Sequence, residues 1–315
     1  MNNHNIEPQQ LPVLPVLSLA TALARKLPPI DYVLPGLPRG KVGMLSAAGG
    51  VGKSYWSLQA ALQVAVGGFV DFDLAGAEFE SGDATGSVLL VSLEDEADDV
   101  SRRLQTIINH WEDDKEQKEW LADIADNELF DIIALAGQGV SLIDNYAMPN
   151  GYIASITEHA QKMHHCRLII IDTLRRAHDA DENDNGVMSK ILRYFEKLAK
   201  DTNAAVLLLH HESKAAIGNA DAGAGAMRGA SAIVDNARWV MRMQRMTAIE
   251  AEARGILDDN IRKQWIRVTN EKTNYGPEEA EKWLLRGYGG VLSKSTPPVK
   301  VDNAAKTKTG RRRSV

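Results

Sequence analysis

One segment of the chain has residue types and spacing that suit phosphate chemistry: Ala47-Ala48-Gly49-Gly50-Val51-Gly52-Lys53-Ser54. It lies between an apolar run, Val42–Leu45, and a helical pattern, Ser54–Val66. The glycines let successive N–H groups turn toward phosphate oxygens, and the start of the helix adds positive dipole. The lysine supplies a cation for the β- and γ-phosphates, and the serine supplies a hydroxyl ligand for Mg²⁺. The segment predicts a nucleotide-binding loop, although an alanine stands where the usual pattern begins with glycine.

Two later apolar runs end in carboxylates. Leu168–Ile171 is followed by Asp172, which predicts a carboxylate that holds Mg²⁺ together with Ser54; a turn-capping aspartate is the alternative. Val88–Leu93 is followed by Glu94, and we interpret this glutamate as a general base that orients an attacking water molecule. The acidic residues after it are typical of a solvated helix start.

A fourth apolar run, Ala205–Leu209, ends in His210-His211. A neutral histidine beside a terminal phosphate can report the nucleotide state to the loop that follows it. Structural packing and metal ligation are the alternatives, but adjacent histidines of a strand point to opposite faces and do not easily bind one ion. The pattern favours sensing.

The elements that must position these residues alternate as strand and helix, and the strands are continuous apolar runs. This predicts an α/β fold with a mostly parallel sheet covered by helices on both faces. Three late runs predict an antiparallel extension of the same sheet: Arg238–Met243, Trp265–Asn270 and Lys282–Leu285.

Composition argues against a disordered chain, a collagen-like repeat and a scaffold held by disulfides. The 315 residues are 44% hydrophobic and 25% charged, which is ordinary for a packed protein. The single cysteine, Cys166, cannot form an internal disulfide, and we expect it to be buried. The first ten residues lack the features of a signal peptide, and no apolar run is long enough for a membrane helix, so we predict a cytoplasmic protein.

The two ends of the chain differ from its middle. Seven of the eleven prolines lie in residues 1–40, which predicts an extended arm with one short helix in Leu17–Leu27. The stretch Ser293–Val315 has seven basic residues and one acid, which predicts a disordered basic tail. We therefore expect an arm at 1–29 that contacts another subunit, a domain at 30–292 and the tail at 293–315.

The order of these strand ends resembles that of RecA-like P-loop ATPases, and shorter motifs narrow the resemblance. Together, from about residue 30 to 292, they are similar to the RepA-type hexameric replicative helicases of broad-host-range (IncQ-like) plasmids. The motifs are Tyr32-Val33-Leu34-Pro35, Asp172-Thr173-Leu174-Arg175-Arg176, His210-His211, Arg228-Gly229-Ala230-Ser231, Val234-Asp235-Asn236-Ala237-Arg238-Trp239 and Lys272-Thr273-Asn274-Tyr275-Gly276.

The resemblance implies a homohexameric ring that hydrolyses ATP with Mg²⁺, moves 5′ to 3′ along single-stranded DNA and unwinds duplex during plasmid replication. Plasmid initiator and primase proteins would be further partners. It assigns Lys53, Ser54, Glu94, Asp172 and His211 the roles given above. It also makes Arg238 an arginine finger for the neighbouring subunit, and places Arg103, with Arg102 as a second candidate, near the nucleotide. Lys272 matches a residue that contacts the neighbour's phosphates, although Asn274 replaces the arginine two positions later.

DNA would meet loops that face the channel of the ring, with Arg175, Arg176, His178, Lys214 and Arg228 as the contact residues. The net charge of −6 argues against nucleic acid only for the outer surface, because a channel gathers basic groups on one axis. Two alternatives remain. A RecA-fold ATPase could form a DNA-binding assembly or filament without unwinding, and a partition-type ATPase is disfavoured because Ala48 replaces the lysine that such a loop requires.

Overall fold

The computed structural model describes residues 14–66, 86–110, 115–212, 237–275 and 281–300. The chain divides into two compact units, Met1–Asp31 and Tyr32–Val315. In the first unit, the described residues contain one short helix, α1 (Leu19–Ala24), whose start is capped when the Ser18 hydroxyl accepts a hydrogen bond from the Thr21 N–H. The helix is shorter than the predicted one.

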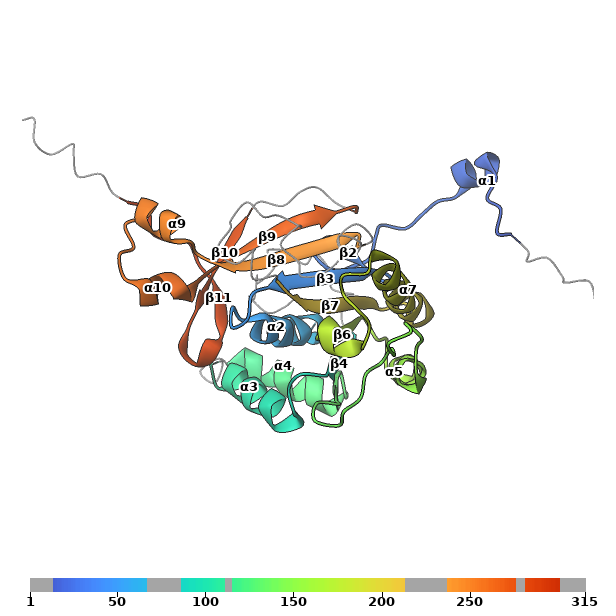
Figure 1. The fold of residues 1–315 in the computed structure, drawn as a ribbon, viewed down its shortest axis with the longest axis horizontal. Coiled ribbons are helices and arrows are strands. Elements are labelled where there is room, and N and C mark those ends of the chain that lie inside the picture. The colour runs from blue at the N-terminus through green and yellow to red at the C-terminus, as the bar shows by residue number, and fades with distance from the viewer. Residues whose placement is uncertain (1–13, 67–85, 111–114, 213–236, 276–280, 301–315) are drawn as a thin grey trace, which may run out of the picture. The chain divides into compact units, whose positions relative to one another are not determined.

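The second unit is built on a nine-stranded sheet with the order β11-β10-β9-β8-β3-β7-β6-β4-β5 (Figure 1). The five strands β3, β7, β6, β4 and β5 are parallel, as the sequence predicts. The strands of this sheet are β3 (Val42–Ala47), β4 (Val88–Ser92), β5 (Phe130–Ala134), β6 (Leu168–Asp172), β7 (Ala205–His211), β8 (Trp239–Arg245), β9 (Trp265–Thr273), β10 (Lys282–Arg286) and β11 (Leu292–Lys294).

Helices cover both faces of the parallel strands, which explains why these strands are apolar throughout (Figure 1). Successive residues alternate between two cores: Leu45 packs with one helix layer and Met44 with the other. The first layer contains α2 (Lys53–Val66), α3 (Ala97–His110) and α4 (Lys115–Asp126). The second contains α5 (Gly151–Lys162), α6 (Leu174–Ala177) and α7 (Asn185–Thr202).

The predicted extension of the sheet is confirmed, with one difference. β8 pairs parallel to β3, so the antiparallel part begins at the pair β8 and β9 and continues through β10 and β11. Two short helices, α9 (Ala248–Ala253) and α10 (Asp259–Gln264), connect β8 to β9. A single 3₁₀ turn, η3 (Tyr288–Gly290), connects β10 to β11.

The prediction of an extended arm through residue 40 is wrong from Tyr32 onward. Two short strands, β1 (Tyr32–Leu34) and β2 (Leu37–Pro38), form a hairpin whose residues Val33, Leu34 and Leu37 are buried. The prolines suggested a structureless segment, but Gly36 has φ +71° and allows the chain to reverse direction. The indole N–H of Trp239 donates to the Pro35 carbonyl at 2.7 Å and fixes the hairpin to β8.

Two further elements differ from expectation. The helix α4, which packs Leu121 and Ile124 against the first core, has no counterpart among the predicted helices. Ser293 and Lys294, assigned to the tail, form part of β11. In the described part of the chain, no helix has the length and apolar character that crossing a bilayer requires.

Candidate nucleotide-binding site

The predicted site residues meet because their strands run in the same direction. In the parallel ladder, Ala47 is opposite His211 and Ser92 is opposite Asp172, so the carboxyl ends of four strands form one edge. A cavity of about 220 Å³ lies at this edge. Its lining residues are Gly50, Gly52, Lys53, Ser54, Tyr55, Glu94, Asp95, Arg103, Asp172, Thr173, His211 and Arg286.

The glycine-rich loop has the backbone that its sequence predicts. Gly50 and Gly52 have φ values of +72° and +122°, which favour glycine, and α2 begins directly afterwards at Lys53. Lys53 is 7% exposed as a residue, and its ammonium donates to the Ala47 carbonyl at 3.2 Å. Burial lowers its pKa, while the negative charges of Asp172 and Glu94 act in the opposite direction. The loop therefore holds a buried cation beside carboxylates.

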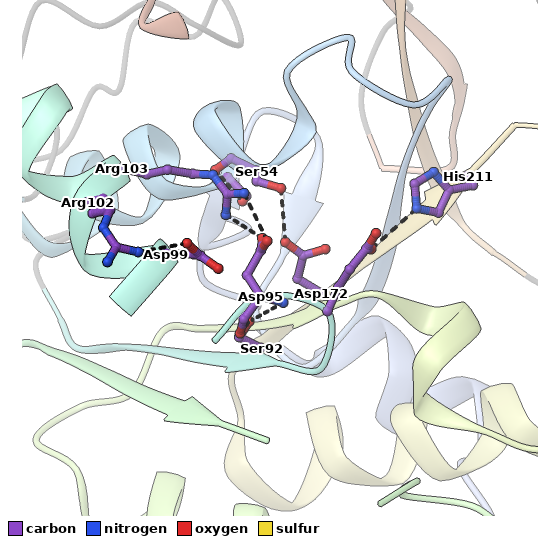
Figure 2. A network of polar contacts seen from close by, with 10 residues as sticks. Ser54, Ser92, Asp95, Asp99, Arg102, Arg103, Asp172 and His211 are labelled. Atoms are coloured by element: carbon purple, nitrogen blue, oxygen red, sulfur yellow. Dashed lines mark hydrogen bonds and ion pairs between the residues drawn. The ribbon is translucent and has the colours of Figure 1, made fainter. Parts of the chain in front are cut away.

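Asp172 and Ser54 lie together, as a shared role at Mg²⁺ requires. The Ser54 hydroxyl donates to Asp172 Oδ2 at 3.3 Å (Figure 2). Burial, together with the charges of Glu94 and Asp95, raises the pKa of Asp172 to about 6. Within the described residues, no cluster of three or more His, Cys, Asp or Glu side chains could hold a metal by itself. The hydroxyl and carboxylate nevertheless fit Mg²⁺, which takes few protein ligands and completes its shell with phosphate oxygens and water.

His211 connects the lysine to the predicted base. Its Nδ1 lies 3.2 Å from Lys53 Nζ, and its Nε2 lies 3.4 Å from Glu94 Oε2. The hydrogen bond from His211 is the largest cause that lowers the pKa of Glu94. The other histidine, His210, is fully buried. His211 is therefore the one of the two that lines the cavity, as sensing would require.

An ion pair closes another side of the cavity. Arg103 Nη2 donates to Asp95 Oδ1 at 2.9 Å, and Arg103 Nη1 contacts Oδ2 of the same carboxylate (Figure 2). Arg102 instead pairs with Asp98 and Asp99 in solvent. Of these two arginines, Arg103 is therefore the one that lines the cavity. Asp95 differs from the solvated acids with which the sequence analysis grouped it, since its carboxylate lines the cavity.

Arg175 and Arg176 are exposed on α6, directly after β6, and the charge of Arg176 helps to lower the pKa of Glu94. His178 is not a surface residue: it is 1% exposed, so its predicted contact with DNA is wrong. The small residues around it pack the segment after α6 into the second core. Lys214 and Arg228 lie outside the described residues.

Arg238 and Lys272 lie at the opposite edge of the sheet from the glycine-rich loop. Arg238 is exposed and immediately precedes β8, in which Val240 is opposite Met44 of β3 on one side and Lys272 of β9 on the other. Arg238 also lines a separate cavity with residues at the start of β3, among them Lys41 and Val42. Neither side chain lines the cavity at the glycine-rich loop.

Sequence reasoning missed four charged residues near the loop. Arg245 and Arg286 each donate a hydrogen bond to the Gly50 carbonyl, at 2.7 Å and 2.9 Å. Arg242 forms a fully buried ion pair with Glu212, with Nε to Oε1 at 2.7 Å. The signal for the first two was weak: each is a basic residue that ends an apolar strand.

Comparison with known proteins agrees with this architecture. A family model described as an AAA domain matches residues 7–216. The chain belongs to the AAA domain family. Among solved structures, the fold is similar to the "ATPase Domain of G40P", with a TM-score of 0.54 and 17% sequence identity over 82% of this chain and 86% of that chain. The unit thus has a RecA-like α/β fold with a mostly parallel sheet.

Proposed function

We propose that the chain is an ATP-dependent DNA helicase that acts as a homohexameric ring on single-stranded DNA, 5′ to 3′, in plasmid replication. The observation that carries this proposal is the separation of Arg238 from the loop of its own subunit. An arginine at the opposite edge of the sheet can complete a nucleotide site only in another copy of the chain. Hydrolysis would then depend on assembly.

In the proposed reaction, the loop N–H groups and the Lys53 ammonium bind the β- and γ-phosphates of ATP. Ser54 and Asp172 would hold Mg²⁺, which when bound neutralises charge that develops on the phosphate oxygens. Glu94 accepts a hydrogen bond from the attacking water and orients it toward the γ-phosphate. The Arg238 guanidinium of the neighbouring subunit stabilises the transition state.

His211 would couple this chemistry to DNA. Its ring contacts both Lys53 and Glu94, and the chain that follows β7 begins one residue later with Glu212. A change at the γ-phosphate therefore reaches the root of that segment. Arg175 and Arg176, which are exposed on α6 after Asp172, would contact DNA phosphates independently of base sequence. We propose the same role for Lys214 and Arg228.

The test is strand displacement on a forked duplex with a 5′ single-stranded tail, measured with ATP and Mg²⁺. The proposal expects unwinding of this fork and none of a fork with only a 3′ tail. DNA-stimulated ATP hydrolysis without unwinding of either fork would contradict it and favour a RecA-fold assembly without helicase activity. Native mass spectrometry with a non-hydrolysable ATP analogue separately tests the six-membered ring.

A further inference from the structure

Two arginines from the far half of the sheet converge on the glycine-rich loop. Arg245 is the last residue of β8, and Arg286 is the last residue of β10. β8 runs parallel to β3, and β9 lies antiparallel between β8 and β10, so both strands end at the same edge as the loop. Their guanidinium groups bind one atom, the carbonyl oxygen of Gly50.

It is unusual for two guanidinium cations to share one neutral carbonyl as their hydrogen-bond acceptor. Among the described residues, neither arginine has a carboxylate within ion-pair distance. Like charges held close together repel, and a carbonyl is a weaker acceptor than an anion. The pair is therefore better suited to an anionic ligand than to the loop alone.

The two arginines face different surroundings. Arg286 lines the cavity that contains Lys53, Ser54, Asp172 and His211. Arg245 instead lines a neighbouring cavity of about 360 Å³ on the side of Ala48 and Val51. Only Arg286 is thus placed toward the predicted phosphate site.

The charges of the cavity also single out Arg286. The Lys53 ammonium already experiences the charges of Asp172, Glu94 and Glu212, and Arg103 is bonded to Asp95. Arg286 is the cation of the cavity that has no such compensation among the described residues. An incoming polyphosphate would give it a charged acceptor.

We propose that Arg286 binds the polyphosphate of the nucleotide in cis, on the same subunit as Lys53, and that Arg245 stays on the Gly50 carbonyl and keeps the loop in shape. This inference rests on the proposed function, since it needs a nucleotide at the loop. When the phosphate enters, the Arg286 N–H transfers from the carbonyl to a phosphate oxygen, a charge-assisted bond that is stronger. The antiparallel extension thereby becomes part of the nucleotide site.

The test compares Arg286→Gln with Arg245→Gln in the full chain, by calorimetric titration with inorganic tripolyphosphate and with ADP in the presence of Mg²⁺. Both substitutions remove one hydrogen bond to the same carbonyl, so each is a control for loop support. We expect Arg286→Gln to weaken both ligands by about 10-fold or more, because a bond to a charged group contributes about 1.5–3 kcal/mol. Arg245→Gln should weaken them clearly less, and Arg193→Gln, at an exposed position of α7, should have no effect.

Equal losses in the two variants would overturn the proposal, because they would indicate loop support only. If Arg286→Gln lost affinity for ADP but not for tripolyphosphate, the proposal would also be overturned, since Arg286 would then contact the nucleoside and not the phosphates. If Arg286→Gln does not fold, Arg286→Lys replaces it, because it keeps the charge but not the planar fork of arginine. Its affinity for tripolyphosphate should then fall below that of the matched Arg245→Lys variant. Failure of the helicase proposal is separate: wild-type protein would then bind tripolyphosphate without unwinding forked DNA.

Mixing experiments test the cis assignment. In rings that contain both Arg286→Gln and Lys53→Ala subunits, no loop has both intact residues on one chain. We expect no recovery of tight tripolyphosphate binding over that of the separate variants. Recovery would show that Arg286 serves the neighbouring subunit instead.

Discussion

The imidazole of His211 contacts the carboxylate of Glu94, with Nε2 3.4 Å from Oε2. The opposite ring nitrogen lies 3.2 Å from Lys53 Nζ, so one ring connects the phosphate-binding cation to the predicted base. Three strand ends thus act as one unit, since a movement of any of these groups changes the hydrogen bonds of the others.

Replacement of His211 by alanine should separate nucleotide binding from hydrolysis. The Glu94 carboxylate loses the hydrogen bond that holds its pKa down, so its pKa rises. A base acts in its ionised form, so the acid limb of the pH–rate profile should move to higher pH. The maximal ATPase rate should fall about 100-fold, while ADP affinity changes little. An unchanged acid limb in steady-state kinetics would contradict the role of this contact.

Arg238→Ala should keep ADP binding and assembly but lose hydrolysis. The guanidinium lies at the opposite edge of the sheet from its own loop, so its removal leaves that loop intact. Loss of an arginine finger lowers turnover by about 10³-fold or more. Steady-state ATPase assays and native mass spectrometry measure the two properties, with Arg193→Ala as the control. Weakened nucleotide binding in an isolated subunit would show that Arg238 acts at its own site.

The buried pair of Arg242 and Glu212 should support stability next to the loop. Both side chains are almost fully buried, and Nη2 of the arginine also donates to Oε2 at 3.1 Å. Arg242→Met leaves a carboxylate buried and should lower the free energy of unfolding by about 3–5 kcal/mol. The double variant with Glu212→Leu should recover part of this loss. Denaturant unfolding checks both, and a double variant less stable than Arg242→Met would contradict the account.

His178 should make stability depend on pH. Burial and the charge of Arg175 lower its pKa from 6.5 to about 4, so the folded protein keeps it neutral while the unfolded chain takes up a proton. The contribution of His178 to the free energy of unfolding is fully present above about pH 6.5. It decreases as the pH falls to about 4 and is constant below that. The total loss is about 3 kcal/mol. His178→Gln should remove this component from the pH dependence of unfolding, and identical slopes in the two proteins would contradict it.

The parallel sheet with helices on both faces could be predicted, because a strand that is buried on both faces is a continuous apolar run in the sequence. The loop and the residues at the ends of β4, β6 and β7 followed from the same pattern, since parallel strands bring their carboxyl ends together. The hairpin at Tyr32 could not be predicted, because prolines hide a turn that only the packing of Val33, Leu34 and Leu37 reveals.

The misassigned residues have a common physical cause. His178 and Asp95 lie in polar, loop-like sequence, but tertiary packing buries the histidine and turns the carboxylate into the cavity. Arg245 and Arg286 depend on register across β8, β9 and β10, and short strands without a repeating pattern do not specify register.

The most direct test of the central claim mixes two inactive variants, Lys53→Ala and Arg238→Ala, and measures ATP hydrolysis without DNA. Each variant alone lacks one half of every site. After random mixing in equal amounts, about one site in four pairs an intact Lys53 with an intact Arg238 of the neighbouring copy. We predict that hydrolysis returns in the mixture. A mixture as inactive as the separate variants, in rings shown by native mass spectrometry to contain both chains, would contradict a nucleotide site completed by the neighbouring subunit.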